Sequence, residues 1–294
     1  MNGKDNLERM IESNLGILHS ILSNNKNVLL DTNILSGPSL PGKGDIINNA
    51  LRKNVVLVEG PKIRVMKIFL ENFSSYVESF EGVVSVPEVI DEMSRFGDMC
   101  RNKVNFIKKY STRNFITNSI NTDAFDFFKS IGECSRRIVE TLRGREINSN
   151  FQFAGNNIYN NFKNLVSLGY NFFGKREKIS PDDGLVAGAL TLLNNEKGHI
   201  TIVSNDMGVF DRIRIIASLY SFYKDIDSNM SGELTSSGMS FYSFNKNTGT
   251  YSLFGDTRNG GMKFYSHKSS EERKIIIWTM DHIKKKNLEC ELIT

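Results

Sequence analysis

The sequence predicts an α/β fold with a central parallel sheet, and two observations carry this prediction. Short apolar segments with the character of buried strands alternate with longer segments of helical periodicity, which is the order of elements that builds a parallel sheet. Two of the predicted strands have an aspartate at or just beyond their carboxyl ends. Because ligands of such sheets bind outside the carboxyl ends of the strands, the same pattern predicts where a functional site lies.

The first predicted elements are a helix and a buried strand. Residues 7–22 place apolar side chains three and four positions apart, the spacing of an amphipathic helix. We therefore assign residues 1–26 to an N-terminal helix packed on the core. Residues 27–31 are short, mostly apolar and followed by polar residues, which predicts a strand with Asp31 at its carboxyl end.

A second helix, strand and helix follow. Residues 62–80 have helical character, and residues 82–86 predict a strand. Pro87 then opens a helix, because proline is tolerated at the first helical position. In that helix Glu88 and Glu92 are one turn apart and share a face.

The segment from about 97 to 179 is predicted to be a large, mainly helical and basic insertion. Between Arg101 and Lys178 it has 14 Lys and Arg residues against 6 Asp and Glu residues. This excess suits contact with a polyanion such as RNA, although a solvated basic helix face would give the same composition. The candidate substrate-binding residues are Arg101, Lys103, Lys108, Lys109, Arg113, Arg136, Arg137, Lys175, Arg176 and Lys178.

A third strand and its helix carry further acidic residues. Ser180 and Pro181 precede Asp182 and Asp183, an arrangement typical of a helix start. Residues 200–204 are apolar and β-branched and predict a strand that leads directly to Asn205 and Asp206.

Residues 226–294 are predicted to form a small α+β C-terminal extension. Residues 241–244 and 251–254 are apolar runs separated by turn-forming residues, which predicts a β-hairpin. Residues 269–272 have the pattern of a capping box and predict a final helix that contains Trp278. A homo-oligomer or a protein partner bound through this extension is compatible with the sequence.

Composition excludes several other classes of protein. The chain has three widely spaced cysteines, an odd number that fits a reducing compartment better than a disulfide framework. Its four histidines form no pair at metal-ligand spacing, so we expect no zinc site. The apolar runs fall far short of the roughly 20 residues that span a bilayer, and the polar N-terminus does not resemble a signal peptide. We expect a cytoplasmic protein without membrane contact.

The acidic residues beside the predicted strands suggest a common chemistry. If Asp31, Glu92, Asp182 and Asp206 converge, their repulsion is on the order of 4 kcal/mol per close pair at an intermediate dielectric, and a divalent cation would relieve it. Carboxylate oxygens suit Mg²⁺ or Mn²⁺, and such ions activate water for hydrolysis of phosphodiesters. Each acid taken alone has a structural alternative, as a helix cap, a turn former or a solvated helix residue.

The segments around these acids resemble the four motifs of PIN domains, in the family's order. Val-Leu-Leu-Asp31-Thr-Asn resembles the first motif and Val-Pro-Glu-Val-Ile-Asp-Glu92 the second. Asp182-Asp-Gly-Leu-Val-Ala-Gly-Ala resembles the third, with Asp183 as the competing position, and Val-Ser-Asn-Asp206 resembles the fourth. The long interval between the second and third motifs exceeds that of compact family members.

What the resemblance implies is a three-layer α/β/α sandwich over residues 27–225, which hydrolyses RNA with Mg²⁺ or Mn²⁺ as an endoribonuclease in RNA processing. Asn33, Ser204 and Asn205 would orient the carboxylates. Two alternatives stay open: a non-catalytic RNA- or protein-binding module on the same fold, and a nuclease directed at DNA.

Overall fold

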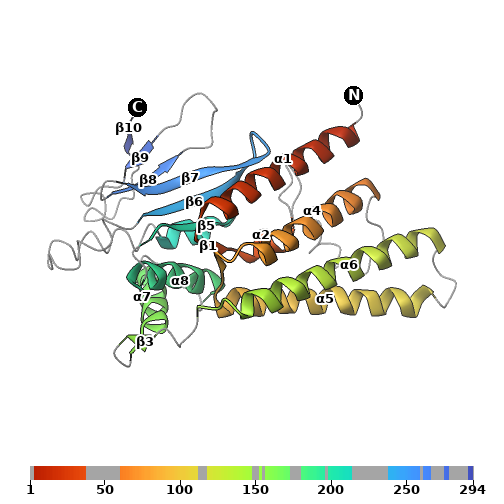
Figure 1. Cartoon of the computed structure of the whole chain (residues 1–294), viewed down its shortest axis with the longest axis horizontal. Coiled ribbons are helices and arrows are strands. Elements are labelled where there is room, and N and C mark those ends of the chain that lie inside the picture. Colours follow the sequence, from red (N-terminus) through yellow and green to blue (C-terminus); the bar gives the residue numbers. More distant parts are fainter. Residues whose placement is uncertain are drawn as a thin grey trace.

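The computed structural model is an α/β fold (Figure 1). It describes residues 3–37, 60–111, 118–147, 152–153, 156–172, 180–195, 198–213, 238–258, 261–265, 275–277 and 291–293. The named helices are α1 (Gly3–Asn24), α2 (Thr32–Leu35), α4 (Gly60–Ser79), α5 (Pro87–Ser111), α6 (Asn118–Arg143), α7 (Ile158–Phe172) and α8 (Pro181–Asn195). Residues 207–213 are also helical. The strands are β1 (Asn27–Leu30), β2 (Val83–Val84), β3 (Gln152–Phe153), β4 (Asn156–Asn157), β5 (Ile200–Val203), β6 (Met239–Asn245), β7 (Thr250–Arg258), β8 (Gly261–Tyr265), β9 (Ile275–Ile277) and β10 (Glu291–Ile293).

The main sheet is mixed, with the strand order β10-β9-β8-β7-β6-β5-β1-β2, and β3 and β4 form a separate pair. β1 is parallel to β2 and to β5, and β5 is parallel to β6. β1, β2 and β5 are the three strands that the sequence predicted for a parallel sheet, and β6, predicted only as one arm of the C-terminal hairpin, adds a fourth. The remaining strands add to one side in antiparallel fashion, so the sheet as a whole is not parallel.

The predicted C-terminal hairpin is present as β6 and β7 and extends the main sheet. Asn14 of α1 binds the turn between β6 and β7. Its Nδ2 atom donates to the carbonyl of Gly249 over 2.9 Å, and its Oδ1 atom accepts from the amide of Tyr251 over 3.1 Å. The predicted final helix is wrong at residues 275–277, which form β9 and pair with β8. Three consecutive isoleucines favour a strand over a helix. Trp278 lies outside the described residues.

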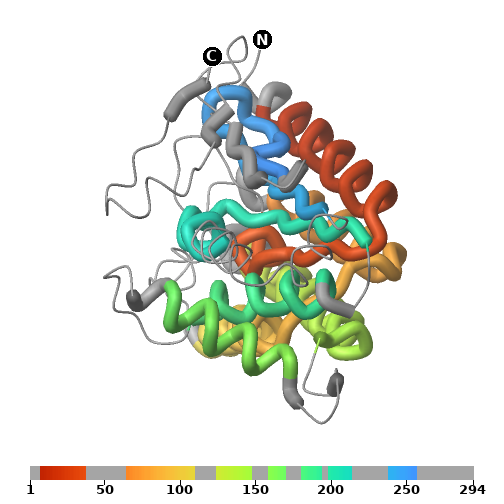
Figure 2. The backbone as a smooth tube through the Cα atoms, turned by 90° about the vertical axis from the view of Figure 1, so that its left-hand side faces the viewer, coloured from red at the N-terminus to blue at the C-terminus, as the bar shows by residue number. Residues whose placement is uncertain are grey.

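The helices form two groups around the sheet. α1, α4, α6 and α5 lie side by side in a row (Figure 1). α8 packs on β1 and β5, and α7 packs on the far side of α8 from these strands (Figure 2). Gly188 allows α8 to pack closely against Val86, because a Cβ atom at position 188 would lie 2.5 Å from Val86 Cγ1.

The row of helices supplies much of the apolar core. Phe69 and Phe73 of α4 and Phe127 and Phe128 of α6 are essentially fully buried. The two cysteines within the described residues, Cys100 and Cys134, are buried and free. None of the described helices has the length and apolar composition needed to cross a membrane.

Candidate functional site

The site begins where the adjacent parallel strands β1 and β5 end. Asp31 follows β1, and its amide donates to the carbonyl of Val203 over 3.0 Å, which keeps the two strand ends together. Ser204 follows β5 and donates its hydroxyl hydrogen to Asp31 Oδ2. The same hydroxyl oxygen accepts from the amide of Asp206 over 3.0 Å. Asp31 and Asp206 are therefore linked through one buried serine.

Two asparagines support this strand-end arrangement. Asn33 Nδ2 donates to Asp31 Oδ2 over 2.7 Å, and Asn33 Oδ1 accepts from the amide of Asn205 over 3.2 Å. Asn205 Oδ1 in turn accepts from the amide of Phe244 in β6 over 3.0 Å. Of the three residues predicted to orient the carboxylates, Asn33 and Ser204 contact Asp31 directly. Asn205 acts one step away, by joining Asn33 to β6.

Glu92 reaches the site from α5. Its Oε2 atom accepts a hydrogen bond from the Thr32 hydroxyl over 2.7 Å, and Thr32 directly follows Asp31. Glu88, one turn earlier, has different partners: its carboxylate accepts from the Tyr159 hydroxyl and pairs with Lys163 Nζ, both on α7. The two glutamates that share a helix face thus have separate roles, and Glu92 is the one beside Asp31.

Asp182 and Asp183 stand in the first turn of α8 and also differ. Asp183 is buried: its Oδ2 accepts from the amide of Ser180 over 2.8 Å, and its Oδ1 accepts from Arg212 Nε over 2.5 Å. This carboxylate caps the helix and neutralises a buried guanidinium. Asp182 Oδ2 accepts from Arg212 Nη1 over 3.0 Å, while its side chain keeps 20% exposure.

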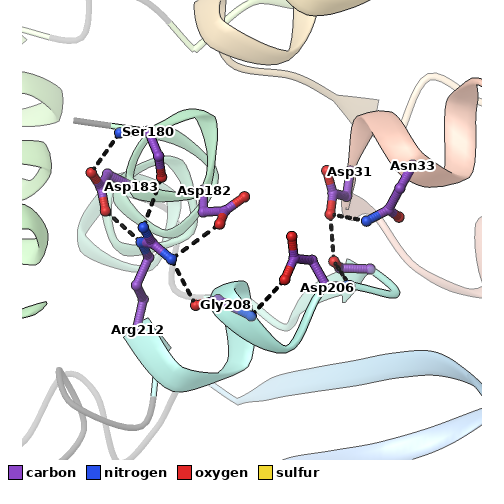
Figure 3. Close-up of polar contacts among 9 residues, drawn as sticks. Asp31, Asn33, Ser180, Asp182, Asp183, Asp206, Gly208 and Arg212 are labelled. Atoms are coloured by element: carbon purple, nitrogen blue, oxygen red, sulfur yellow. Dashed lines mark hydrogen bonds and ion pairs between the residues drawn. The ribbon is translucent and has the colours of Figure 1, made fainter. Parts of the chain in front are cut away.

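Three of the predicted carboxylates face one shared space. In Figure 3, Asp31, Asp182 and Asp206 approach this space from three segments of the chain, and Asp183 points away from it. Gly208 borders the space, because a Cβ atom at this residue would lie 2.9 Å from Asp182 Oδ2 and 3.1 Å from Asp206 Oδ1. Asp206 Oδ1 accepts from the Gly208 amide over 2.7 Å, so Asp206 also caps residues 207–213.

Burial and neighbouring charges disfavour the ionised forms of Asp31 and Asp182. Burial raises the pKa of Asp31 to about 6; the hydrogen bond from Ser204 opposes this rise, and the charges of Asp206 and Glu92 add to it. Burial raises the pKa of Asp182 to about 7; Arg212 opposes the rise, and Asp206, Asp31 and Asp183 add to it. Asp31 thus lies within range of the charges of Glu92 and Asp206, and Asp182 within range of those of Asp31 and Asp206.

This donor set fits a hard divalent cation. The carboxylates of Asp31, Asp182 and Asp206 face one space, and carboxylate oxygens are ligands that such cations prefer. Gly208 lies at the edge of this space, where a Cβ atom would crowd Asp182 and Asp206. Within the described parts of the chain, no three Asp, Glu, His or Cys side chains are already close enough to form a metal site. The residues that could hold a cation are thus gathered around the space but not in contact across it.

Two of the predicted substrate-binding residues make contacts within the helical row. Lys103 is buried and lies 5.4 Å from the ring centroid of Phe106, and burial lowers the pKa of Lys103. Arg137 of α6 binds Ser74 over 2.8 Å and Glu78 over 3.5 Å, both on α4. Lys103 and Arg137 thus take part in packing within the helical row, and their contact with a substrate stays a prediction.

The other basic candidates are more exposed or outside the structure. Arg101 pairs with Asp98 over 2.9 Å on the surface of α5, and Arg136 pairs with a glutamate one turn away on α6 over 3.3 Å. Lys108 and Lys109 are exposed near the end of α5, about 25 Å along the helix from Glu92 at about 1.5 Å per residue. Outside the described residues lie Arg113, Lys175, Arg176 and Lys178.

Sequence reasoning missed three residues of the site: Thr32, Gly208 and Arg212. Thr32 donates a hydrogen bond to Glu92, and Gly208 lies close to Asp182 and Asp206. The sequence alone gives no indication of either contact. Arg212 had a signal, because it lies among Val209, Phe210 and Ile213, which are all buried. A charged side chain on the apolar face of a helix indicates a buried ion pair.

Comparison with known proteins gives no independent identification. No protein-family model matches the chain, no curated protein matches it, and no solved structure matches it.

Proposed function

We propose that this protein is a metal-dependent nuclease of PIN-domain type, which hydrolyses RNA with Mg²⁺ or Mn²⁺. One observation supports this best: Asp31, Asp182 and Asp206 face a shared space beside the ends of parallel strands, with Glu92 joined to the same turn through Thr32. Ligand sites of α/β proteins lie at such strand ends. The proposal includes the three-layer α/β/α arrangement of that family.

The acidic residues and their hydrogen-bond donors would have different roles in this reaction. Asp31, Asp182 and Asp206 supply the oxygens that would hold the cation, and Glu92 stands beside Asp31. Ser204 and Asn33 both donate to Asp31 Oδ2, which fixes the orientation of that carboxylate. A bound Mg²⁺ or Mn²⁺ ion lowers the pKa of a water molecule and stabilises the charge that develops on the leaving oxygen.

RNA is the substrate that we propose. Arg101, Lys108 and Lys109 of α5 are exposed, and the helix that carries them begins beside the carboxylate cluster. Contacts with the phosphate backbone along α5 would hold a strand whose cleaved bond lies at Glu92, and such contacts are largely independent of sequence. Cleavage within the strand, as an endoribonuclease, is part of this proposal.

A second candidate is a non-catalytic RNA- or protein-binding module. One observation favours it: Arg212 already neutralises part of the charge of Asp182. In that case the acids would serve structure alone, and no divalent cation would be bound.

The test is cleavage of end-labelled RNA and DNA oligonucleotides with Mg²⁺, Mn²⁺ or EDTA, using purified full-length protein and Asp31→Asn. We expect internal cuts in RNA that need the metal and disappear in the variant. The matched control is Asp126→Asn, an exposed carboxylate on α6, which should cut like the wild type. Cuts confined to DNA would redirect the proposal to a DNA nuclease. RNA binding without cleavage under any condition would favour the binding module.

A further inference from the structure

Arg212 is a charged side chain with only 1% exposure. Moving a guanidinium out of water is costly unless its hydrogen-bonding groups and its charge are matched. In this protein all three nitrogens are engaged. Nε donates to Asp183, Nη1 donates to Asp182 and to the carbonyl of Gly208 over 3.0 Å, and Nη2 donates to Ser180 Oγ over 2.8 Å.

These bonds join two of the three segments that make the carboxylate cluster. Ser180, Asp182 and Asp183 belong to the start of α8, whereas Gly208 and Arg212 belong to the helical residues 207–213 that follow Asp206. The Gly208 amide binds Asp206, and the Gly208 carbonyl binds Arg212. A single short unit therefore sets how far Asp182 lies from Asp206.

The bond to Asp182 also sets the direction of its carboxylate. Arg212 holds the Oδ2 atom, and Figure 3 shows the Asp182 carboxylate turned toward Asp206 and Asp31. A planar guanidinium can bind Asp182 and Asp183 together because its donors point in fixed directions. A lysine at this position would keep the charge but would not reproduce these four contacts.

We propose that Arg212 is a positioning residue that orients Asp182 toward the cation held by Asp31, Asp182 and Asp206. This inference rests on the proposed metal-dependent function. It assigns Arg212 a role in metal affinity, beyond the neutralisation of Asp183. Residues that orient metal ligands change metal affinity by roughly 10- to 100-fold when they are replaced.

The test is Mn²⁺ binding by titration calorimetry, without substrate, for the wild type and Arg212→Lys. Because lysine keeps the positive charge, a weaker affinity would report lost geometry. We expect binding to weaken about tenfold or more. The matched control is Arg137→Lys, another arginine that ties two helices together, which should lower thermal stability and leave Mn²⁺ affinity unchanged.

A double-mutant cycle separates positioning from general destabilisation. In an Asp182→Asn background, Arg212→Lys should cause no further loss of Mn²⁺ affinity, because the carboxylate that it orients is gone. Equal losses in both backgrounds would overturn the inference. Wild-type Mn²⁺ affinity in a folded Arg212→Lys protein would also overturn it and leave the proposed function intact. No Mn²⁺ binding by the wild type would overturn both.

If Arg212→Lys does not fold, Ser180→Ala takes its place. This variant removes only the Nη2 contact and keeps both ion pairs of Arg212. We expect a smaller loss of Mn²⁺ affinity that again disappears in the Asp182→Asn background. Unchanged affinity in Ser180→Ala would then contradict the positioning role.

Discussion

Thr32 donates its hydroxyl hydrogen to Glu92 Oε2 over 2.7 Å, and this bond joins the residue after Asp31 to the first turns of α5. Glu92 thereby has a fixed place next to the end of β1, although 60 positions separate it from Thr32.

Replacing Thr32 with valine should lower the free energy of unfolding by about 1–3 kcal/mol, because a hydrogen bond to a charged group is lost and Glu92 loses its donor. Thr32→Ser keeps the hydroxyl and should lose less. Urea unfolding of the two variants measures the difference. Equal losses would show that the hydrogen bond contributes nothing beyond packing.

Replacing Asp183 should destabilise the protein more than replacing Asp182. Asp183→Asn should cost about 3–5 kcal/mol, because it breaks a buried ion pair and leaves Arg212 with less charge compensation. The Asp183 side chain is 3% exposed, against 20% for Asp182. Asp182→Asn should therefore destabilise the fold less.

For Mn²⁺ binding we expect the larger effect at Asp182. Asp182→Asn should reduce the rise in melting temperature that Mn²⁺ causes, while folded Asp183→Asn should keep that rise in full. Thermal unfolding with Mn²⁺ and with EDTA gives both readings. If Mn²⁺ instead raised the melting temperature of Asp182→Asn but not that of Asp183→Asn, Asp183 would be the metal ligand.

Gly208→Ala should be destabilising, because its Cβ atom would lie within 3.1 Å of Asp182 Oδ2, Arg212 Nη1 and Asp206 Oδ1. Overpacking typically costs about 1–3 kcal/mol, which exceeds the gain of about 0.5–1 kcal/mol from replacing a helical glycine. Gly16→Ala in α1 is the control, because nothing lies within 4 Å of its new Cβ atom. We expect Gly16→Ala to stabilise the protein. Stabilisation by both changes would contradict the crowded site.

Without metal, stability should fall as the pH rises from the acidic range to neutrality. The pKa of Asp31 is raised to about 6 and that of Asp182 to about 7, from an ordinary value of 3.8. The folded chain therefore binds these protons more tightly than the unfolded chain, so the stabilisation is complete below pH 3.8 and is lost between that value and about 7.

The pH effect can be measured by unfolding in EDTA from pH 5 to about 8. An Asp31→Asn, Asp182→Asn double variant lacks both titrating groups, so its stability should decline less than that of the wild type over this range. Comparison with this variant removes the contribution of other groups. Curves that stay parallel would mean that these carboxyls have ordinary pKa values in the folded protein.

Much of the architecture could be predicted from local patterns. The strands that precede Asp31 and Asp206 are short apolar runs that end in polar residues, and these features depend only on neighbouring positions. The hairpin of β6 and β7 was also predictable, because its apolar runs flank turn-forming residues. In contrast, the parallel pairing of β5 with β6 joins Ile200 to Met239, and local patterns do not encode such distant contacts.

The site could be predicted only in part. The resemblance to PIN motifs selected four acids, and the charge interactions of Asp31 and Asp182 involve all of them. It left Asp182 and Asp183 unresolved, because both suit a helix start. Their difference depends on Arg212, which lies 30 positions beyond Asp182. The basic residues were harder still, since composition does not distinguish the buried Lys103 from the exposed Lys109.

The most direct test of the central proposal is to locate Mn²⁺ by anomalous diffraction in crystals of the full-length protein grown with the ion. We predict an anomalous peak about 2.1 Å from carboxylate oxygens of Asp31, Asp182 and Asp206. At saturating Mn²⁺, the lack of any peak among these three acids, with Arg212 still bound to Asp182, would contradict the metal site and favour a non-catalytic binding module.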